Sequence, residues 1–528
     1  MQEITRDRSA PRAVAVPQSP VLQRDDIVLS RGRLALVNPG IAPAEAMAED
    51  LLFVRSVLDA AGIDFLLVRG NDSRPVLAVD ETRREEFAAA LADACAGEPF
   101  YAKAAEGRRR SSVLVSDGRL SKDSEASAVL LFRPRVSARG GLRYGAPQGV
   151  RVEFWRRDSG LILAPENALM RDVAPADELT PAAIELYGLT WPTLEGMFEP
   201  HAHDIDFDID LVFSWVDGAS IEWQRARARR MQSYVVGEGD DSHARFRQLD
   251  ELKYALRSVY LFAPWVRTIH IVTDSPRPDW LVDHPRVRIV RSEEFFADAS
   301  VLPTHNSHAV ESQLQNIPGL SEHFLYSNDD MFFGRPVGPE LFFSPGGVSR
   351  FIEATTRIGL GSPAAQRSGF ENAARINRGL LSERFGKLIT RHLEHSPVPM
   401  RISIVRELES EFPEEFARTA ASTFRSATDI SVTNSLYHYY ALLTGRAVLE
   451  TRAKVKYVDT TAHSGLAAMR RVLQSRSKDL FCLNDGSFPE ISDEERATAV
   501  QAFLEDYFPV AAPWERAAAT RPLAAQSR

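Results

Sequence analysis

The chain has 528 residues, which is more than a single hydrophobic core accommodates, so we expect two or three domains. Its 63 lysines and arginines are outnumbered by 72 aspartates and glutamates, which argues against a nucleic-acid-binding protein. The two cysteines, Cys95 and Cys482, exclude a disulfide framework and favour a reducing, cytoplasmic compartment. No stretch reaches the roughly 20 apolar residues of a membrane-spanning helix, and the first residues lack the apolar core of an export signal.

The first part of the chain predicts a small α+β domain. Apolar residues recur at helical spacing over Ala44–Ala61 and over Thr82–Ala96. Two acids in this part, Asp80 and Glu153, are candidate site residues, but a place on the surface is the usual explanation for such acids. Strand-like runs lie at Phe65–Gly70, Val76–Val79, Ala128–Phe132 and Val150–Trp155.

The second part of the chain predicts alternating strands and helices. An amphipathic helix is expected at Ala244–Phe262, between the first two of four strand-like runs, and a final packing helix at Ser492–Tyr507. Strand–helix–strand order favours a parallel, Rossmann-like sheet. The four runs are Leu211–Val216, Thr268–Thr273, Val287–Val290 and His323–Ser327.

These patterns divide the chain into five segments. The segment between the two domains is rich in proline and acidic residues, which is typical of a linker. The five segments are a disordered lead at 1–25, the α+β domain at 26–173, the linker at 174–204, the second domain at 205–515 and a frayed tail at 516–528.

Acidic residues follow two of the predicted strands. Asp217 comes after the first strand, and Asn328, Asp329 and Asp330 follow the fourth. The carboxyl ends of parallel strands share one edge of a sheet, where ligands bind. Adjacent carboxylates need a neutralising cation, and Mg²⁺ held together with nucleotide phosphates is the usual solution. We therefore expect Asp329 and Asp330 to bind a metal, with a simple turn or helix cap as the alternative.

Two basic residues border the apolar stripe of the helix at Ala244–Phe262. Lys253 and Arg257 follow Asp250 at helical spacing. One interpretation is a solvated margin with ion pairs on the helix surface. The other is that Lys253 and Arg257 reach a phosphate-bearing ligand at the strand ends. The sequence does not separate the two.

Four ordered blocks of the second part resemble the Stealth family of sugar-phosphate transferases. They are IDLVFSWVDG at Ile209–Gly218, the long run from Phe246 to Val337 that ends in LYSNDDMFFGRPV, the run EHSPVPMRIS to SATDI at Glu394–Ile430, and FCLND at Phe481–Asp485. The resemblance covers roughly residues 205–510 and leaves the first 200 unassigned. It implies a Rossmann-like, glycosyltransferase-A-like catalytic domain with helical additions.

The resemblance also implies a reaction, in which a sugar-1-phosphate moves from a UDP-sugar to an acceptor hydroxyl and forms a phosphodiester. His395 matches a histidine of the family motif and is expected to be a general base or phosphate ligand. Arg425 matches an arginine suited to clamp the transferring phosphate, since its planar fork meets phosphate oxygens in pairs. Asp429 would orient Arg425 or cap the following turn. Asp217 and Asp330 join the catalytic set, and Mg²⁺ or Mn²⁺ is the expected cofactor.

Further residues of the matching blocks are candidates for substrate contacts. Asn306, Ser307 and Glu311 precede the fourth strand and Asn328 follows it. Each is expected to contact donor or acceptor. The turn Asn484–Asp485 either closes the site or caps a helix. Cys482 has an apolar setting and is expected to be packed in the interior rather than to act as a nucleophile.

The partners expected are a UDP-sugar and a saccharide acceptor, without nucleic acid. The basic segment Ile376–Leu393 is a solvated face or a contact to an anionic membrane surface or growing polymer. Two other functions remain open at this point. One is an ordinary nucleotide-sugar glycosyltransferase, and the other is a non-catalytic sugar-nucleotide-binding assembly subunit.

Overall fold

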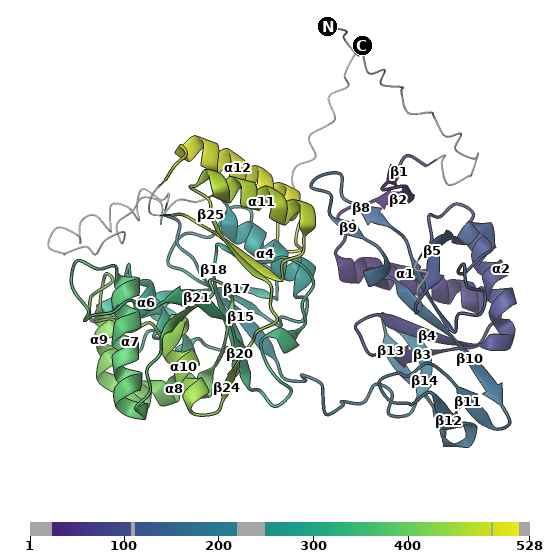
Figure 1. The fold of residues 1–528 in the computed structure, drawn as a ribbon, viewed down its shortest axis with the longest axis horizontal. Coiled ribbons are helices and arrows are strands. Elements are labelled where there is room, and N and C mark those ends of the chain that lie inside the picture. Colours follow the sequence, from purple (N-terminus) through teal and green to yellow (C-terminus); the bar gives the residue numbers. More distant parts are fainter. Residues whose placement is uncertain (1–23, 107–110, 219–248, 487–488, 517–528) are drawn as a thin grey trace, which may run out of the picture. The chain divides into compact units, whose positions relative to one another are not determined.

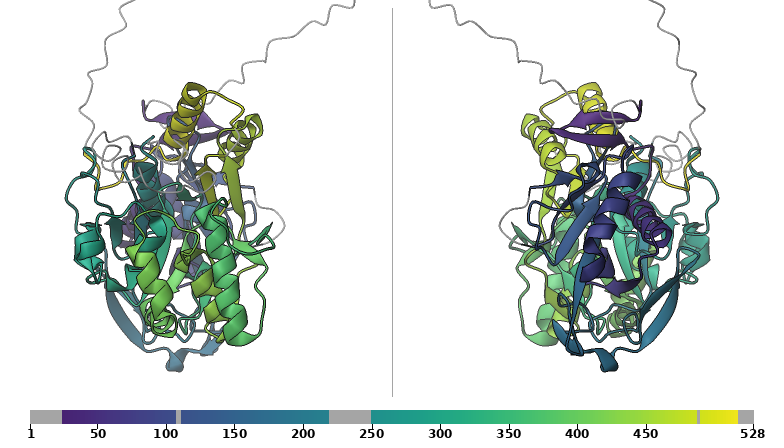
Figure 2. Two further views of the ribbon diagram at one scale, coloured as in Figure 1. Left: turned by 90° about the vertical axis from the view of Figure 1, so that its left-hand side faces the viewer. Right: turned by 90° about the vertical axis from the view of Figure 1, so that its right-hand side faces the viewer.

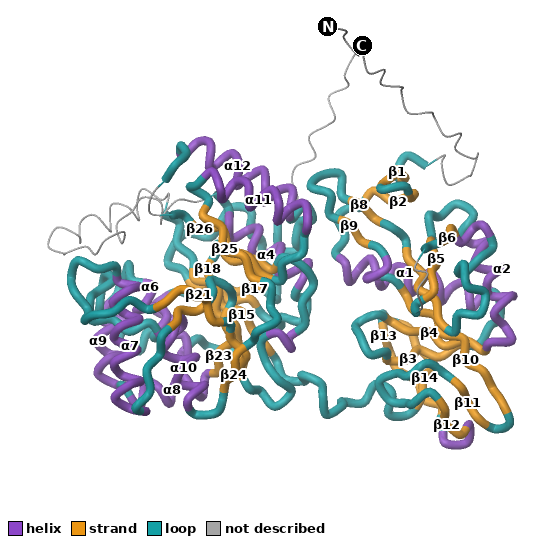
Figure 3. Tube along the Cα trace, viewed as in Figure 1, coloured by secondary structure: helices purple, strands orange, loops and turns teal. Residues whose placement is uncertain are grey.

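The computed structural model describes residues 24–106, 111–218, 249–486 and 489–516 (Figure 1). These residues form two compact units. The first comprises the chain up to Glu199 without Arg139–Leu142, and the second comprises Arg139–Leu142 and everything from Pro200 onward. Each unit mixes helices and strands (Figure 3).

The first unit is built around an eight-stranded sheet with helices α1 and α2. Strand β10 lies at its centre, antiparallel to β7 and parallel to β4. Buried apolar side chains of both helices and the sheet form its core. The elements are β1 (Ile27–Ser30), β2 (Arg33–Val37), α1 (Pro43–Ala60), β3 (Phe65–Arg69), β4 (Pro75–Asp80), α2 (Arg84–Ala94), β5 (Tyr101–Ala104), β6 (Val113–Leu114), β7 (Ala128–Phe132), β8 (Arg135–Val136), β9 (Arg143–Tyr144), β10 (Val150–Asp158), β11 (Leu161–Leu163), β12 (Val173–Pro175), β13 (Pro181–Leu186) and β14 (Leu189–Leu194).

The prediction of a linker at 174–204 is wrong for most of these residues. Strands β13 and β14 pair there as a tight hairpin whose turn is Tyr187–Gly188. Both turn residues have positive φ, 53° and 71°, which is the backbone of a two-residue hairpin turn. Trp191 is fully buried in the core of the first unit. The hairpin therefore belongs to this unit.

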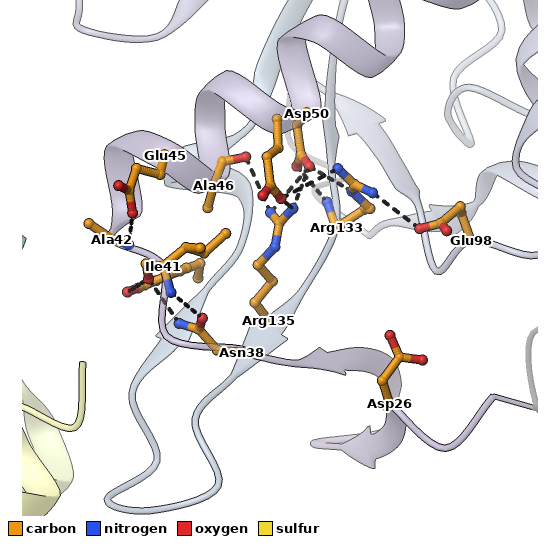
Figure 4. A network of polar contacts seen from close by, with 12 residues as sticks. Asp26, Asn38, Ile41, Ala42, Glu45, Ala46, Asp50, Glu98, Arg133 and Arg135 are labelled. Carbon is orange, nitrogen blue, oxygen red and sulfur yellow. Dashed lines mark hydrogen bonds and ion pairs between the residues drawn. The ribbon is translucent and has the colours of Figure 1, made fainter. Parts of the chain in front are cut away.

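Charged residues are buried in the first unit where α1 meets the strands. Asp50 of α1 accepts hydrogen bonds from Arg133 at 2.7 Å and from Arg135 at 3.2 Å (Figure 4). Arg133 lies between β7 and β8, and Arg135 lies in β8. Burial raises the pKa of Asp50, although both arginines oppose that rise. Glu153, expected at the surface, is also buried, and it accepts from the Trp155 indole at 3.0 Å. Asp80 caps a short helical turn through the Thr82 backbone N–H.

The second unit contains the parallel sheet that the sequence predicts. Its strand order is β17-β16-β15-β18-β23, with the first four strands parallel and β23 antiparallel to β18. A smaller sheet, β19-β26-β25, continues from the end of β18. Helices α11 and α12 lie side by side in all views (Figures 1 and 2).

The four parallel strands of the second unit begin and end within two residues of the predicted strands. The predicted helix at Ala244–Phe262 is α4 from Glu251, and its first residues up to 248 lie outside the described residues. The elements are β15 (Ile209–Ser214), α4 (Glu251–Phe262), β16 (Ile269–Val272), β17 (Val287–Val290), α5 (Ser292–Phe295), α6 (Ser307–Glu311), β18 (His323–Asn328), β19 (Met331–Phe333), β20 (Ser349–Phe351), β21 (Glu353–Arg357), α7 (Gly369–Phe385), β22 (Arg391–Leu393), β23 (Val398–Arg401), α8 (Ile402–Glu411), α9 (Pro413–Ala421), α10 (Tyr437–Leu443), β24 (Ala447–Leu449), β25 (Val455–Asp459), α11 (His463–Ser475), β26 (Leu480–Asn484) and α12 (Asp493–Tyr507).

Candidate functional site

The acidic strand ends lie at one edge of the parallel sheet. Strands β15 and β18 are neighbours, and Ser214 at the end of β15 is paired with Asn328 at the end of β18. Asp217 follows three residues after Ser214, and its backbone N–H donates to the Ser275 hydroxyl at 2.8 Å. Asp329 and Asp330 form the two-residue turn between β18 and β19. The register thus brings the predicted acids to a common edge.

His395 and Asp330 contact each other at this edge. The imidazole Nε2 lies 3.2 Å from Asp330 Oδ2, and both side chains are partly exposed. Burial alone would lower the pKa of His395. The carboxylates of Asp330, Asp329 and Glu394 outweigh burial and raise the pKa above its ordinary value. An imidazole oriented by a carboxylate is the arrangement of a general base and its positioning group.

Cys482 lies beside this pair, a position that sequence reasoning missed. It is fully buried, as expected, but one ligand atom each from Asp330, His395 and Cys482 lies within 4.8 Å of the others. The neighbouring Leu483 N–H donates to the Asp330 carbonyl at 3.0 Å, which fixes β26 against the acidic turn. Burial and then the charge of Asp330 raise the pKa of the thiol well above its ordinary value.

A second group of predicted residues surrounds the start of α6. The Arg425 guanidinium donates to the Ser307 hydroxyl at 2.7 Å, so these two predicted residues do meet. Asn306 is buried and caps α6 by accepting from the His308 N–H. Its amide donates to Asp429 at 2.8 Å, and Asp429 in turn accepts from the Ser426 N–H. Asn306 and Asp429 therefore fix the loop that carries Arg425, and Asp429 closes the turn that precedes it rather than one that follows.

Glu311 is a buried acid whose two oxygens both have partners. It accepts from the Tyr326 hydroxyl at 3.2 Å and from the Thr433 hydroxyl at 2.6 Å. Burial and the charge of Glu311 raise the pKa of Tyr326, and the charge of Arg425 opposes them. The structure thus places Glu311 in the packing behind Arg425.

Arg257 and Lys253 of α4 both face the carboxylate of Glu515. Arg257 makes two hydrogen bonds of 2.7 Å to the carboxylate of Glu515 and a third of 2.8 Å to the Phe508 carbonyl. Lys253 lies 3.9 Å from the same carboxylate. Glu515 is buried, so this group ties the C-terminal segment to α4. These contacts favour the ion-pair interpretation for Arg257, and a contact of Lys253 with a phosphate-bearing ligand stays a prediction.

The fourth block also contains a buried ion pair. Asp485 pairs with Arg496 of α12 and accepts from the Thr460 hydroxyl at 2.8 Å. This turn therefore anchors α12 beside β26.

The basic segment expected at Ile376–Leu393 divides between α7 and β22. Arg378 donates to a backbone carbonyl, and Arg384 and Arg391 pair with glutamates. These partners favour a structural role over a membrane surface. Within the described parts of the chain, every helix is too short or too polar to cross a bilayer.

Comparison with known proteins identifies the family. Conserved regions 1 to 4 of the Stealth proteins match residues 207–235, 245–351, 394–442 and 470–525. The "Exopolysaccharide phosphotransferase CpsY" of Mycobacterium tuberculosis (strain CDC 1551 / Oshkosh) is 59% identical over 494 residues, which is 93% of each chain. The "Exopolysaccharide phosphotransferase" of Nocardia farcinica (strain IFM 10152) is 53% identical over 92% of this chain and 91% of its own.

The chain belongs to the Stealth family. An alignment of 494 residues extends well into the first unit, beyond the four conserved regions, so the likeness is wider than the sequence blocks indicate. Among solved structures, the galactosyltransferase LgtC in complex with donor and acceptor sugar analogues has a TM-score of 0.29 at 12% identity, over 57% of this chain and 96% of its own.

All four Stealth regions contribute residues to the edge that carries Asp330. Region 1 contributes Asp217, region 2 the turn with Asp330, region 3 His395, and region 4 Cys482. Residues more than 250 positions apart therefore come from all four regions to one part of the second unit.

Proposed function

We propose that this Stealth protein transfers a sugar-1-phosphate from a UDP-sugar to a hydroxyl group of a saccharide acceptor during polysaccharide synthesis. The exopolysaccharide phosphotransferase names of relatives that match along 91–93% of their length support the reaction class. The contact between His395 and Asp330 at the end of β18 is the observation that carries the mechanism.

In this reaction the acceptor oxygen forms a bond to the phosphorus that bears the sugar. The bond from this phosphorus to the oxygen bridging to the nucleotide breaks, and UMP leaves with that oxygen. The sugar C1–O bond stays intact. His395 accepts the proton of the acceptor hydroxyl, and Asp330 orients the imidazole and stabilises its protonated form.

Phosphoryl transfer depends on positioning and on neutralising charge. Arg425 supplies a planar fork for two phosphate oxygens, and Ser307 and the buried Asn306–Asp429 pair hold its loop in place. The oxygens of Asp329 and Asp330 are the donors that Mg²⁺ or Mn²⁺ prefers, and one oxygen of Asp330 is buried without a hydrogen-bond partner among the described residues. When bound there, such a cation neutralises the diphosphate. Asp217 and Asn328 share the edge and would contact the donor.

Product analysis tests the proposal. The full-length protein is incubated with a panel of UDP-sugars and saccharide acceptors, the released nucleotide is quantified, and the product is examined by phosphorus NMR. We expect UMP and a phosphodiester. UDP with a simple glycosidic product would instead indicate an ordinary glycosyltransferase, and binding without turnover would indicate an assembly subunit.

Two variants test the roles proposed for His395 and Arg425. His395→Ala and Arg425→Ala are each expected to lower turnover by roughly a hundredfold or more while the fold persists. The matched control is His203→Ala, at an exposed histidine of the same unit, which we expect to behave as wild type. Wild-type turnover in either site variant would refute the assignment.

We further infer that the five-stranded sheet has the glycosyltransferase-A-like layout, supported by its four parallel strands and antiparallel edge strand. A cytoplasmic location fits two free cysteines and a nucleotide-activated donor.

A further inference from the structure

We propose that Asp330, His395 and Cys482 form a binding site for Zn²⁺, and that an ion bound there inhibits the enzyme. The inhibition rests on the role proposed above for His395, whereas the binding site rests on geometry alone. The three residues come from the β18–β19 turn, from the segment after β22 and from β26. Cys482 is fully buried, and the side chains of Asp330 and His395 are partly exposed.

The backbone holds the three groups close together. Cys482 of β26 is paired with Met331 of β19, and Met331 is the residue that follows Asp330 in the chain. The Leu483 N–H donates to the Asp330 carbonyl at 3.0 Å, and His395 Nε2 lies 3.2 Å from Asp330 Oδ2. One ligand atom from each residue lies within 4.8 Å of the other two.

These distances suit zinc after a small adjustment. With metal–ligand bonds of about 2.0–2.3 Å, neighbouring ligands of a tetrahedral zinc ion lie roughly 3.3–3.8 Å apart. The observed limit of 4.8 Å therefore requires side-chain movements of about 1 Å. Three protein ligands leave the fourth position open to water or phosphate, as in many zinc sites.

The donor set favours zinc over magnesium. Thiolate, imidazole and carboxylate are ligands of Zn²⁺, whereas Mg²⁺ prefers six oxygens. Asp330 Oδ1 is a buried oxygen without a hydrogen-bond partner among the described residues, and an ion would supply its missing partner. Cys482 gives up its thiol proton to solvent when the ion binds, and the S–Zn bond replaces the S–H bond.

Zinc at this position removes the base from the reaction. When the nitrogen that faces Asp330 binds zinc, the ring proton stays on the other nitrogen, which then has no lone pair to accept the acceptor proton. Asp330 is also withdrawn from the oxygen ligands available to Mg²⁺. Mg²⁺ is therefore expected to support turnover, and Zn²⁺ to stop it.

Cobalt binding tests the site without any assay of turnover. Co²⁺ substitutes for Zn²⁺ and gives a visible spectrum with a charge-transfer band when a thiolate is bound. We expect this band in the full-length wild type, its removal by added Zn²⁺, and its absence in Cys482→Ser. Cys95→Ser is the matched control, because Cys95 is the other buried free cysteine and belongs to the first unit. Wild-type protein without the band, or a band lost equally in Cys95→Ser, overturns the proposal.

Inhibition is measured as UMP release in Mg²⁺ with increasing Zn²⁺, relative to the activity of each variant without zinc. We expect Cys482→Ser to need at least tenfold more Zn²⁺ for half inhibition than wild type or Cys95→Ser. Equal sensitivity of all three refutes the inhibitory role. If Cys482→Ser does not fold, His395→Gln replaces it in the cobalt titration. If the protein shows the cobalt band but releases no UMP, the metal site stands and the proposed function is refuted.

Discussion

Asp210, in the first Stealth region, offers a direct test of how the sheet is stabilised. Its side chain is fully buried at the amino end of β15, opposite the candidate site. One oxygen accepts from Arg267 and the Thr268 N–H, and the other accepts from Arg267, His270 and the Ser321 N–H. Asp210 therefore connects β15, β16 and the segment before β18.

The free energy of this group follows from its pKa. Burial alone would raise the pKa of Asp210, but hydrogen bonds from His270, Arg267 and Ser321 outweigh burial and lower the pKa from 3.8 to about 2. At about 1.36 kcal/mol for each pH unit, the ionised form stabilises the fold by about 2–3 kcal/mol at neutral pH. Because the pKa of the folded state is the lower one, this contribution is present above about pH 4 and is lost as the pH falls toward about 2.

Asp210→Asn imitates the protonated acid. Urea unfolding at pH 7 should show a loss of about 2–3 kcal/mol, with faster hydrogen exchange in β15, β16 and β18. Asp208→Asn is the matched control, because Asp208 pairs with the same Arg267 at 3.0 Å but is 62% exposed. An exposed pair contributes less than about 1 kcal/mol. Equal losses in the two variants, or a difference between Asp210→Asn and wild type that persists unchanged at pH 2, would refute this reasoning.

Further variants test three assignments made from the structure. Asp50→Ala should destabilise the first unit by about 3–5 kcal/mol, because it removes the buried carboxylate that Arg133 and Arg135 share. Asp59→Ala, on the exposed side of the same helix, should cost less than about 0.5 kcal/mol, and urea unfolding compares the two variants. Arg257→Ala should lower stability but leave the KM for the donor unchanged, and a tenfold rise in KM would restore Arg257 to the donor site. Ser307→Ala should reduce kcat/KM by roughly tenfold, through loss of one hydrogen bond to a charged group, and Arg425→Lys by more than that because its fork is lost.

Local patterns in the sequence were sufficient to predict most strands and helices, but they did not place the boundary between the first unit and the linker correctly. The parallel strands of the second unit are short apolar runs bounded by polar residues, and this signal is carried within each segment. The hairpin at 181–194 was missed because its prolines and acids resemble a linker. The alternation of apolar and polar residues on both sides of Tyr187–Gly188 was the signal that could have found it.

The long-range partners were not accessible from sequence patterns. Arg257 and Glu515 lie 258 positions apart, and neither periodicity nor spacing indicates that they meet. The same holds for Cys482, whose apolar neighbours correctly predicted burial but not the adjacent Asp330 and His395. His395 and Arg425 became candidates only through the family motifs, since a motif records chemistry that spacing alone does not.

The acids at the two ends of the central sheet differ in their hydrogen-bond partners. At the amino end, both oxygens of Asp210 are saturated by an arginine, a histidine and backbone N–H groups, so its charge is neutralised within the protein. At the carboxyl end, Asp330 contacts His395 through one oxygen, and its second oxygen is buried and finds no hydrogen-bond partner in the part of the chain that the structure describes. A buried oxygen without a partner costs free energy unless a ligand supplies one. That cost, carried by Asp330 and avoided at Asp210, is the physical reason for which we propose that the cation and the transferring phosphate bind at the carboxyl edge.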